Sequence, residues 1–332
     1  PPSEVWLQNT SLECATVIVR WRGHADCGAP QSQTLDIAPG ESGRFVPMLG
    51  AANWGGGWVE STQPLAVQVL VDYATGRAAY NAPAAAAGLA EEDVVAYAPL
   101  VYNGYQGWST RMHLQSRSAS TEARVRIEIV DRSGDVVTTV VHALCPNGTD
   151  VISLDALGGL PANWVGSARI TSTRWFSASD PIQVLPGIAG VVELTRRGPT
   201  GGDTADVSEV AVYPLLAGSA SFVPLAEGEL PSSERTTGAK VLALGAMVKA
   251  GGREKATTAM AITNLATRPG FTNIVLYFYD QNGLVDYVCQ LLGRQQTEHI
   301  DLTGWGYLNP GFKGSAIVSA WFWEHDVFDA NG

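Results

Sequence analysis

The sequence lacks the features of several large protein classes. It contains no run of about 18 uninterrupted apolar residues, so we expect no transmembrane helix in these 332 residues. Charged residues make up only 16% of the chain, and acidic residues outnumber basic ones by 32 to 21, which gives a net charge of −11. A nucleic-acid partner would need clustered Lys and Arg, so an acidic chain of this kind argues against one.

Motifs that would carry chemistry are also missing. The segment 40–43, Gly-Glu-Ser-Gly, lacks the spacing of a nucleophile elbow, and no EF-hand calcium loop occurs. Only His299 has acidic neighbours in an expected strand, and a surface or structural role explains that arrangement. We therefore expect no enzyme activity and no catalytic, cofactor-binding or metal-binding residues. Calcium in an inter-repeat turn at Asp131 and Asp135, or at Asp280, is the alternative, although hairpin turns alone explain these residues. The histidines are scattered along the chain: His24, His113, His142, His299 and His325.

Glycine, proline and apolar residues are plentiful. The chain has 36 Gly and 18 Pro, and 45% of its residues are apolar, which is typical of a turn-rich folded protein and excludes a disordered one. Short stretches of alternating polarity are separated by turn signals, and no long pattern with a period of 3.6 residues occurs. These patterns predict an all-β chain of the β-sandwich type.

One unit recurs three times along the sequence. Each copy has a first strand, a turn containing glycine, a second strand and a later glycine that opens another strand. Residues 131–134 and 280–283 combine Asp or Asn with Gly, which predicts tight hairpin turns. The first strand and the later glycine are 50, 52 and 52 positions apart in the three copies: Leu7 to Gly57, Leu114 to Gly166 and Ile262 to Gly314.

We therefore predict three tandem Ig-like β-sandwich modules joined by short linkers. Residues 1–82 form the first module, which lacks its first strand, and residues 94–196 form the second. Residues 207–332 form the third, which has an extra strand or insertion. The Cys and Trp spacing of true immunoglobulin domains is absent, so the similarity is one of architecture.

The four cysteines comprise a near pair, Cys14 and Cys27, and two distant ones, Cys145 and Cys289. The near pair flanks an expected strand and turn, and we predict a disulfide that closes this hairpin and implies an oxidising compartment. Two free buried thiols, or a metal site with His24, are the alternatives. We interpret Cys145 and Cys289 as buried, small apolar residues.

The first copy starts directly at its first strand, which predicts an open acceptor edge at Val5, Trp6 and Leu7. Two strand-like segments precede the third copy, although it needs only one. The spare segment is a candidate donor strand, which would join one subunit to the next. A truncated chain, or a missing strand supplied by the chain itself, is the alternative. The candidate donor residues are apolar: Val210, Val212, Leu215 and Leu216.

The second copy combines several short motifs: Pro-Leu at 99–100, Gly-Trp-Ser-Thr at 107–110, Leu-Gln-Ser at 114–116 and Gly-Ser-Ala at 166–168. Together with Asp-Pro-Ile at 180–182, they resemble a tandem Ig-like β-sandwich repeat found in secreted and surface proteins of filamentous bacteria. The resemblance implies an extracellular module of uncharacterised role and supplies no catalytic residues.

These observations favour an extracellular or cell-surface structural protein, a subunit of a filament, sheath or surface layer that assembles head to tail with itself. The alternative is a carbohydrate-binding or adhesive surface protein that contacts surface glycans through exposed aromatic residues, with Trp321 and Trp323 as candidates. The chain begins Pro1-Pro2-Ser3, without an initiator Met or an export signal, which indicates a processed or truncated product.

Overall fold

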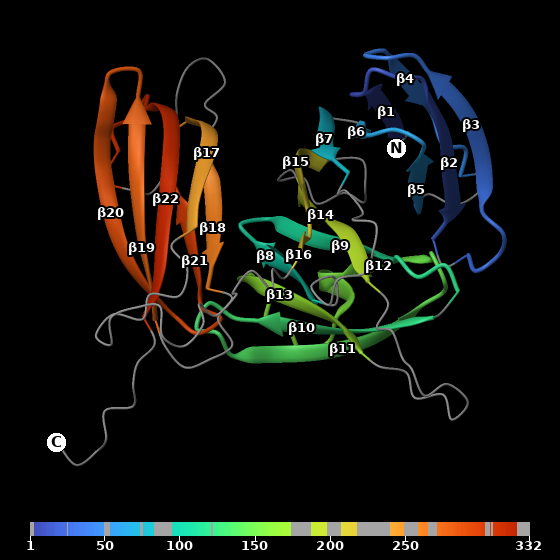
Figure 1. Ribbon diagram of the computed structural model, residues 1–332. Coiled ribbons are helices and arrows are strands. Elements are labelled where there is room, and N and C mark those ends of the chain that lie inside the picture. Colours follow the sequence, from blue (N-terminus) through green and yellow to red (C-terminus); the bar gives the residue numbers. More distant parts are fainter. Residues whose placement is uncertain are drawn as a thin grey trace, which may run out of the picture. The chain divides into compact units, whose positions relative to one another are not determined.

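A computed structural model of the chain shows an all-β protein (Figure 1). It forms two compact units: residues 1–128 with 138–218, and residues 129–137 with 219–332. The predicted all-β class is confirmed, whereas the count of three modules stays a prediction. The structure describes residues 3–24, 26–49, 54–73, 76–82, 95–120, 122–173, 187–197, 207–217, 240–248, 258–264, 271–302, 306 and 308–323.

The first unit begins with two small sheets that enclose one core. Strand β2 alternates between buried and more exposed positions, because successive residues of a strand point to opposite faces. Its buried residues Val17, Val19 and Trp21 pack with Leu7, Ile37 and Phe45. One sheet has the order β4 (Ser42–Phe45), β1 (Ser3–Asn9), β6 (Leu65–Tyr73) and β7 (Gly76–Asn81); the other has the order β3 (Gln31–Ile37), β2 (Ala15–Gly23) and β5 (Gly55–Ser61).

The rest of the first unit is one larger sheet. Its apolar positions again alternate, as in β10, where Ala123, Val125 and Ile127 are buried. The path runs through β11 (Val136–Leu144), β10 (Ala123–Val130), β13 (Trp164–Thr173), β8 (Val95–Tyr105), β9 (Trp108–Ser116), β14 (Ile188–Arg197) and β15 (Val207–Pro214). Two short strands pair beside this path, β12 (Thr149–Ser153) with β9 and β16 (Leu216–Ala217) with β8.

The second unit contains a four-stranded sheet and a two-stranded sheet. Ile274, Leu276 and Phe278 of one sheet share a core with Ile300 of the other. Phe312 joins this core, with its ring 6.3 Å from that of Phe278. The larger sheet has the order β17 (Lys240–Val248), β22 (Lys313–Trp323), β19 (Phe271–Asp280) and β20 (Gly283–Gly293), and the smaller pairs β18 (Ala259–Thr263) with β21 (Thr297–Asp301).

A buried asparagine recurs in both sandwiches and supports the predicted repeat. In the first unit, the side-chain amide of Asn9, which is 0% exposed, donates hydrogen bonds to the carbonyl oxygens of Ile37 and Ala38 at 3.1 and 3.3 Å. In the second unit, Asn264 donates in the same way to Leu292 and Gly293 at 3.1 and 2.9 Å. The sequence separations are 28 and 29 residues in both cases. The two copies therefore share a local fold.

The predicted hairpin turns are confirmed. Asp280 accepts a hydrogen bond from the backbone N–H of Asn282 at 2.7 Å, and Gly283 has a φ of 118°. Asp131 accepts one from Ser133 at 2.9 Å, and Gly134 has a φ of 95°. Each Asp side chain thus substitutes for a backbone acceptor, and each Gly takes a positive φ that other residues rarely adopt.

The predicted acceptor edge is not an edge. Strand β1 lies between β4 and β6, and Val5, Trp6 and Leu7 pair with residues of both neighbours. The chain itself supplies the pairing, because β4 and β6 follow within the same copy. Val5, Trp6 and Leu7 therefore have no free side on which to accept a strand from another subunit.

The candidate donor segment is also paired within the chain. Strand β15, which contains Val210 and Val212, runs antiparallel to β14, and Leu216 pairs with Tyr97 of β8. Leu215 is buried, and its N–H donates a hydrogen bond to Gly190 at 2.9 Å. Residues 207–217 therefore belong to the first unit, not to the third predicted module.

Candidate functional site

The first unit contains three links between residues of the first predicted module and residues of the second. One is a disulfide between Cys27 and Cys145, which are 118 residues apart in sequence. Closing a loop of this length stabilises the folded chain by on the order of 4–5 kcal/mol in the chain-entropy model. This disulfide connects the β2–β3 hairpin to the turn that precedes β12.

The disulfide predicted between Cys14 and Cys27 is therefore wrong, and Cys14 is free and exposed. The reason is geometric. Cys14 immediately precedes β2, whereas Cys27 follows its far end. A strand of nine residues advances by roughly 30 Å, which is far more than the ~7 Å that a disulfide allows between Cα atoms. Cys289 is also free, but it is exposed rather than buried as predicted.

The second link is a pair of histidines on one carboxylate. Nδ1 of His24 lies 3.2 Å from Oδ1 of Asp150, and Nδ1 of His142 lies 3.1 Å from Oδ2. His24 follows β2, His142 lies on β11 and Asp150 lies on β12. Both carboxylate oxygens are thus engaged by imidazoles that come from distant parts of the chain.

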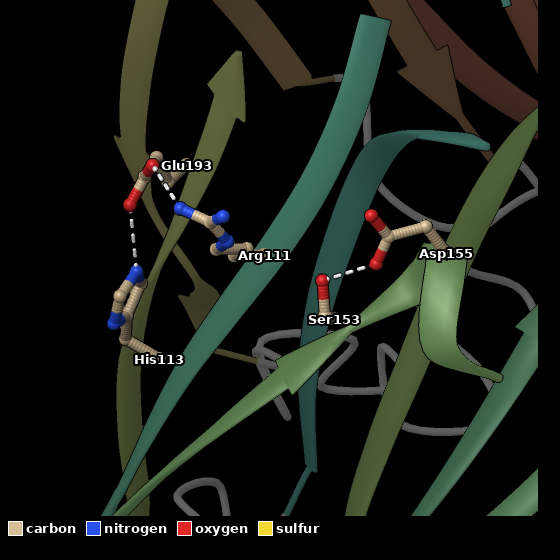
Figure 2. Close-up of polar contacts among 5 residues, drawn as sticks. All are labelled: Arg111, His113, Ser153, Asp155 and Glu193. Carbon is tan, nitrogen blue, oxygen red and sulfur yellow. Dashed lines mark hydrogen bonds and ion pairs between the residues drawn. The ribbon is translucent and has the colours of Figure 1, made fainter. Parts of the chain in front are cut away.

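The third link is centred on Glu193, whose side chain is only 2% exposed. Glu193 lies on β14 opposite Arg111 of β9, and His113 is two residues further along the same face of β9. Nε2 of His113 is 2.9 Å from the carboxylate and Nη1 of Arg111 is 3.5 Å from it. Figure 2 shows both side chains directed at Glu193, while Ser153 and Asp155 form a separate pair.

Two side chains from the first predicted module complete this cluster. The hydroxyl of Tyr73, on β6, donates a hydrogen bond to Glu193, and burial together with the negative charge of Glu193 raises the pKa of that phenol. The ring of Trp54 lies 5.0 Å from that of His113, and the Arg111 guanidinium lies 5.5 Å from the Trp54 ring centroid. A cation over an indole face in this way is attractive.

The Glu193 cluster is built to hold strands together. Its carboxylate accepts hydrogen bonds from Arg111 and His113 and interacts with the Tyr73 phenol. Removing any partner would leave a buried charge or polar group unpaired, which is costly. We therefore interpret it as a lock between strands.

The described part of the chain includes a small pocket. A pocket of about 160 Å³ lies at the end of the β2–β3 hairpin, beside Trp21, Arg22 and His24. This volume is below the range of roughly 300–1,000 Å³ that is typical of small-molecule sites. Within the described ranges, no three His, Cys, Asp or Glu residues are grouped so that they could hold a metal ion, and no helix is long and apolar enough to cross a membrane.

The structure does not decide the aromatic candidates. Trp321 and Trp323 lie on β22, in register with Asn273 and Phe271 of β19. Their side chains lie outside the described part of the structure. Glycan binding through these two residues therefore stays a prediction.

Sequence reasoning missed the residues that form the links. Glu193 gave a usable signal, because it is a single acid inside the apolar stretch 188–194 of β14, where an unpaired charge would be costly. Arg111 and His113 share one face of an otherwise half-buried strand, which is the matching signal. Cys145 gave no such signal, because the pairing of two cysteines that are 118 residues apart depends on how the sheets pack.

Comparison with known proteins adds no family to this description: no protein-family model matches the chain, and no curated protein is significantly similar to it.

Proposed function

We propose that the protein is an extracellular structural protein, a subunit of a surface filament, sheath or surface layer that associates with further copies of itself. The observation that carries this proposal is the set of links inside the first unit. One covalent bond and two buried or half-buried ionic clusters tie distant segments together.

A disulfide of this kind fits an extracellular location. Disulfides persist in oxidising compartments and are rare where the glutathione and thioredoxin systems keep thiols reduced. Cys27–Cys145 closes a long loop, so it restricts relative movement of the segments that it joins. A subunit that transmits force or keeps a fixed spacing benefits from this restriction, whereas an enzyme with a moving lid would not.

The links also bear on how copies could associate. Strand donation is not supported, because both the donor segment and the acceptor strand have partners in their own chain. We propose instead that complete units meet through their surfaces. The resemblance of the second copy to repeats of secreted and surface proteins supports the same class of function.

Electron microscopy of native material from the source cells tests this function, with the protein identified in the imaged fraction by mass spectrometry. We expect ordered filaments, sheaths or sheets that contain this chain and that lose order when Glu193 is changed to Gln in the producing cells. A Thr10→Ala variant, altered at an exposed hydroxyl, is the matched control. Finding the chain only as dispersed monomers would contradict the proposal.

A further inference from the structure

The outer face of the second unit's larger sheet is unusually apolar. On β20, every second residue faces away from the core, and this row is exposed. Tyr287 and Leu291 are 59% and 58% exposed, Val285 is 43% exposed, and Cys289 is an exposed thiol. The Tyr287 ring lies 6.3 Å from the ring of Tyr277 on β19. The outward-pointing residues of β19, β20 and β22 are Asn273, Val275, Tyr277, Val285, Tyr287, Cys289, Leu291, Ile317 and Ser319. The β20 residues among them are exposed, whereas Val275 is only 5% exposed.

The register of the strands allows a residue-by-residue comparison with the first unit. In β2–β3, Arg20 pairs with Ser32, Ile18 with Thr34 and Thr16 with Asp36. The corresponding pairs in β19–β20 are Tyr277 with Tyr287, Val275 with Cys289 and Asn273 with Leu291. The third strands of the two sheets, β5 and β22, correspond in the same way: Trp58 and Glu60 of β5 are equivalent to Ile317 and Ser319 of β22.

The two outer faces differ in charge. The first carries Arg20, Asp36 and Glu60, with Arg20 3.1 Å from Glu60 and Asp36 accepting a hydrogen bond from Thr16. The equivalent residues of the second unit, Tyr277, Leu291 and Ser319, carry no charge. A solvated sheet face normally carries polar side chains, so a contiguous apolar face indicates an interaction surface.

We propose that this outer face binds the same face of a second copy of the chain, in an isologous contact related by a two-fold axis. The proposed function makes a second copy the occupant, and the charge of the chain favours this face for the contact. Two copies with a net charge of −11 repel one another, so a contact between uncharged faces brings the fewest like charges together. The outer face of β19, β20 and β22 meets that condition with itself, whereas the equivalent face of β2, β3 and β5 does not.

The contact resembles the packing of two sheets in a sandwich. Sheet faces pack about 10 Å apart with interdigitated side chains, and Tyr residues are frequent energetic anchors of such interfaces. Tyr287 and Leu291 would insert between residues of the partner copy, which brings the two Cys289 thiols to the same buried region. This inference identifies a subunit contact for the proposed structural function. It rests on that function because the function makes a second copy the partner.

Sedimentation velocity of the full-length oxidised protein over a concentration series tests the contact. We expect the unchanged chain to dimerise and Tyr287→Lys to weaken dimerisation by at least about 30-fold, since it places a charge at a hot-spot aromatic. Ser32→Lys, at the equivalent position of the first unit, is the matched control and should leave the dimer unchanged. A chain that is monomeric at every concentration, or equal dissociation constants for the two variants, would overturn the proposal.

Cross-linking with a short bismaleimide gives a second measurement that does not depend on a destabilising substitution. We expect a covalent dimer from the unchanged chain and from Cys14→Ser, and none from Cys289→Ser. Cross-linking that requires Cys14 instead would contradict the proposed contact. If native assemblies exist and Tyr287→Lys leaves them intact, this contact is wrong and the structural function stands. If the dimer forms and no native assembly is found, the contact stands and the structural function fails.

Discussion

The β2–β3 hairpin and the β19–β20 hairpin both have apolar inward-facing residues, but their outward-facing residues differ in charge. Val17, Val19 and Trp21 fill the core of one sandwich, while Ile274, Leu276 and Phe278 occupy the equivalent positions of the other. The comparison teaches that one pattern of inner row and buried asparagine is compatible with two different outer rows. The outer row is therefore free to be either solvated or used for contact.

The same two hairpins differ in how they use cysteine. Cys27 lies in the connection between the two strands of the first hairpin and forms the disulfide with Cys145, whereas Cys289 lies in the second strand of the other hairpin as an exposed thiol. Cys27 is thus bonded within its own chain. Cys289 lies on the outer face that we propose contacts another copy.

The largest expected effect on the free energy of unfolding comes from replacing Cys27, whereas replacing Cys289 should have little effect. Cys27→Ser should lower the free energy of unfolding of the oxidised protein by on the order of 4–5 kcal/mol, because the unfolded chain is no longer closed across 118 residues. Cys289→Ser, studied at concentrations where the chain is monomeric, should change it by less than about 0.5 kcal/mol. Chemical denaturation followed by circular dichroism measures both. Equal midpoints for the two variants would contradict the difference.

Replacing the buried asparagines tests whether the inner architecture is shared. Asn9→Ala and Asn264→Ala should each cost about 1–3 kcal/mol, because each removes a side-chain donor from at least two backbone carbonyls. Thr10→Ala, beside Asn9 but exposed, should cost about 1 kcal/mol or less. A large cost at one asparagine and none at the other would break the equivalence of the two copies.

Acidification should affect the second sandwich through His299. His299 on β21 occupies the position that is equivalent to that of Arg44 on β4, because β21 pairs with β18 in the same register as β4 pairs with β1. Burial, followed by the charge of Arg132, lowers the pKa of His299. The unfolded chain therefore binds a proton more readily than the folded one as the pH falls below about 6.5, so stability falls with it.

His299→Gln should reduce this pH dependence by up to one proton equivalent, measured as the slope of the unfolding free energy against pH between about 5 and 7. Arg44→Gln is the control, because arginine does not titrate in this range. An unchanged slope in the His299 variant would show that other groups produce it.

The smallest effect concerns the charged outer face of the first hairpin. Hydrogen bonds from Trp58 and Arg20 lower the pKa of Glu60, so their contribution is present above the usual Glu range and is lost as the pH falls through the lowered value. Glu60 and Arg20 are both substantially exposed. A double-mutant cycle of Arg20→Ala and Glu60→Ala should give a coupling of about 1 kcal/mol or less. A much larger coupling would mean that this face is buried in an assembly.

The fold class and the turns could be predicted because their causes are local. Alternation in 15–21 follows from one buried sheet face, and Asp-Gln-Asn-Gly at 280–283 encodes a turn in four consecutive residues. The predicted repeat likewise rests on similar inner rows that recur at a fixed spacing in the sequence. Such signals need no knowledge of how sheets pack.

The strand partners and the disulfide could not be predicted because they depend on contacts between distant residues. Val5, Trp6 and Leu7 look the same in sequence whether β1 is an edge or a central strand, since both have one apolar face. The partner of Cys27 follows from which loops meet, and the nearest cysteine in sequence was the wrong choice. The locks around Glu193 also combine residues from β6, β9 and β14.

The long separation of Cys27 and Cys145 has a consequence for biosynthesis. Cys27 leaves the ribosome 118 residues before its partner, whereas Cys14 has already been made and is only a short loop away. Short loops close at a lower entropic cost than long ones, so the nascent chain favours the Cys14–Cys27 bridge first. If that bridge forms, the native bond requires thiol–disulfide exchange, in which Cys145 attacks the sulfur of Cys27 and releases Cys14 as a thiolate. An early Cys14–Cys27 bridge would therefore make maturation of this chain depend on an environment that permits disulfide exchange as well as oxidation.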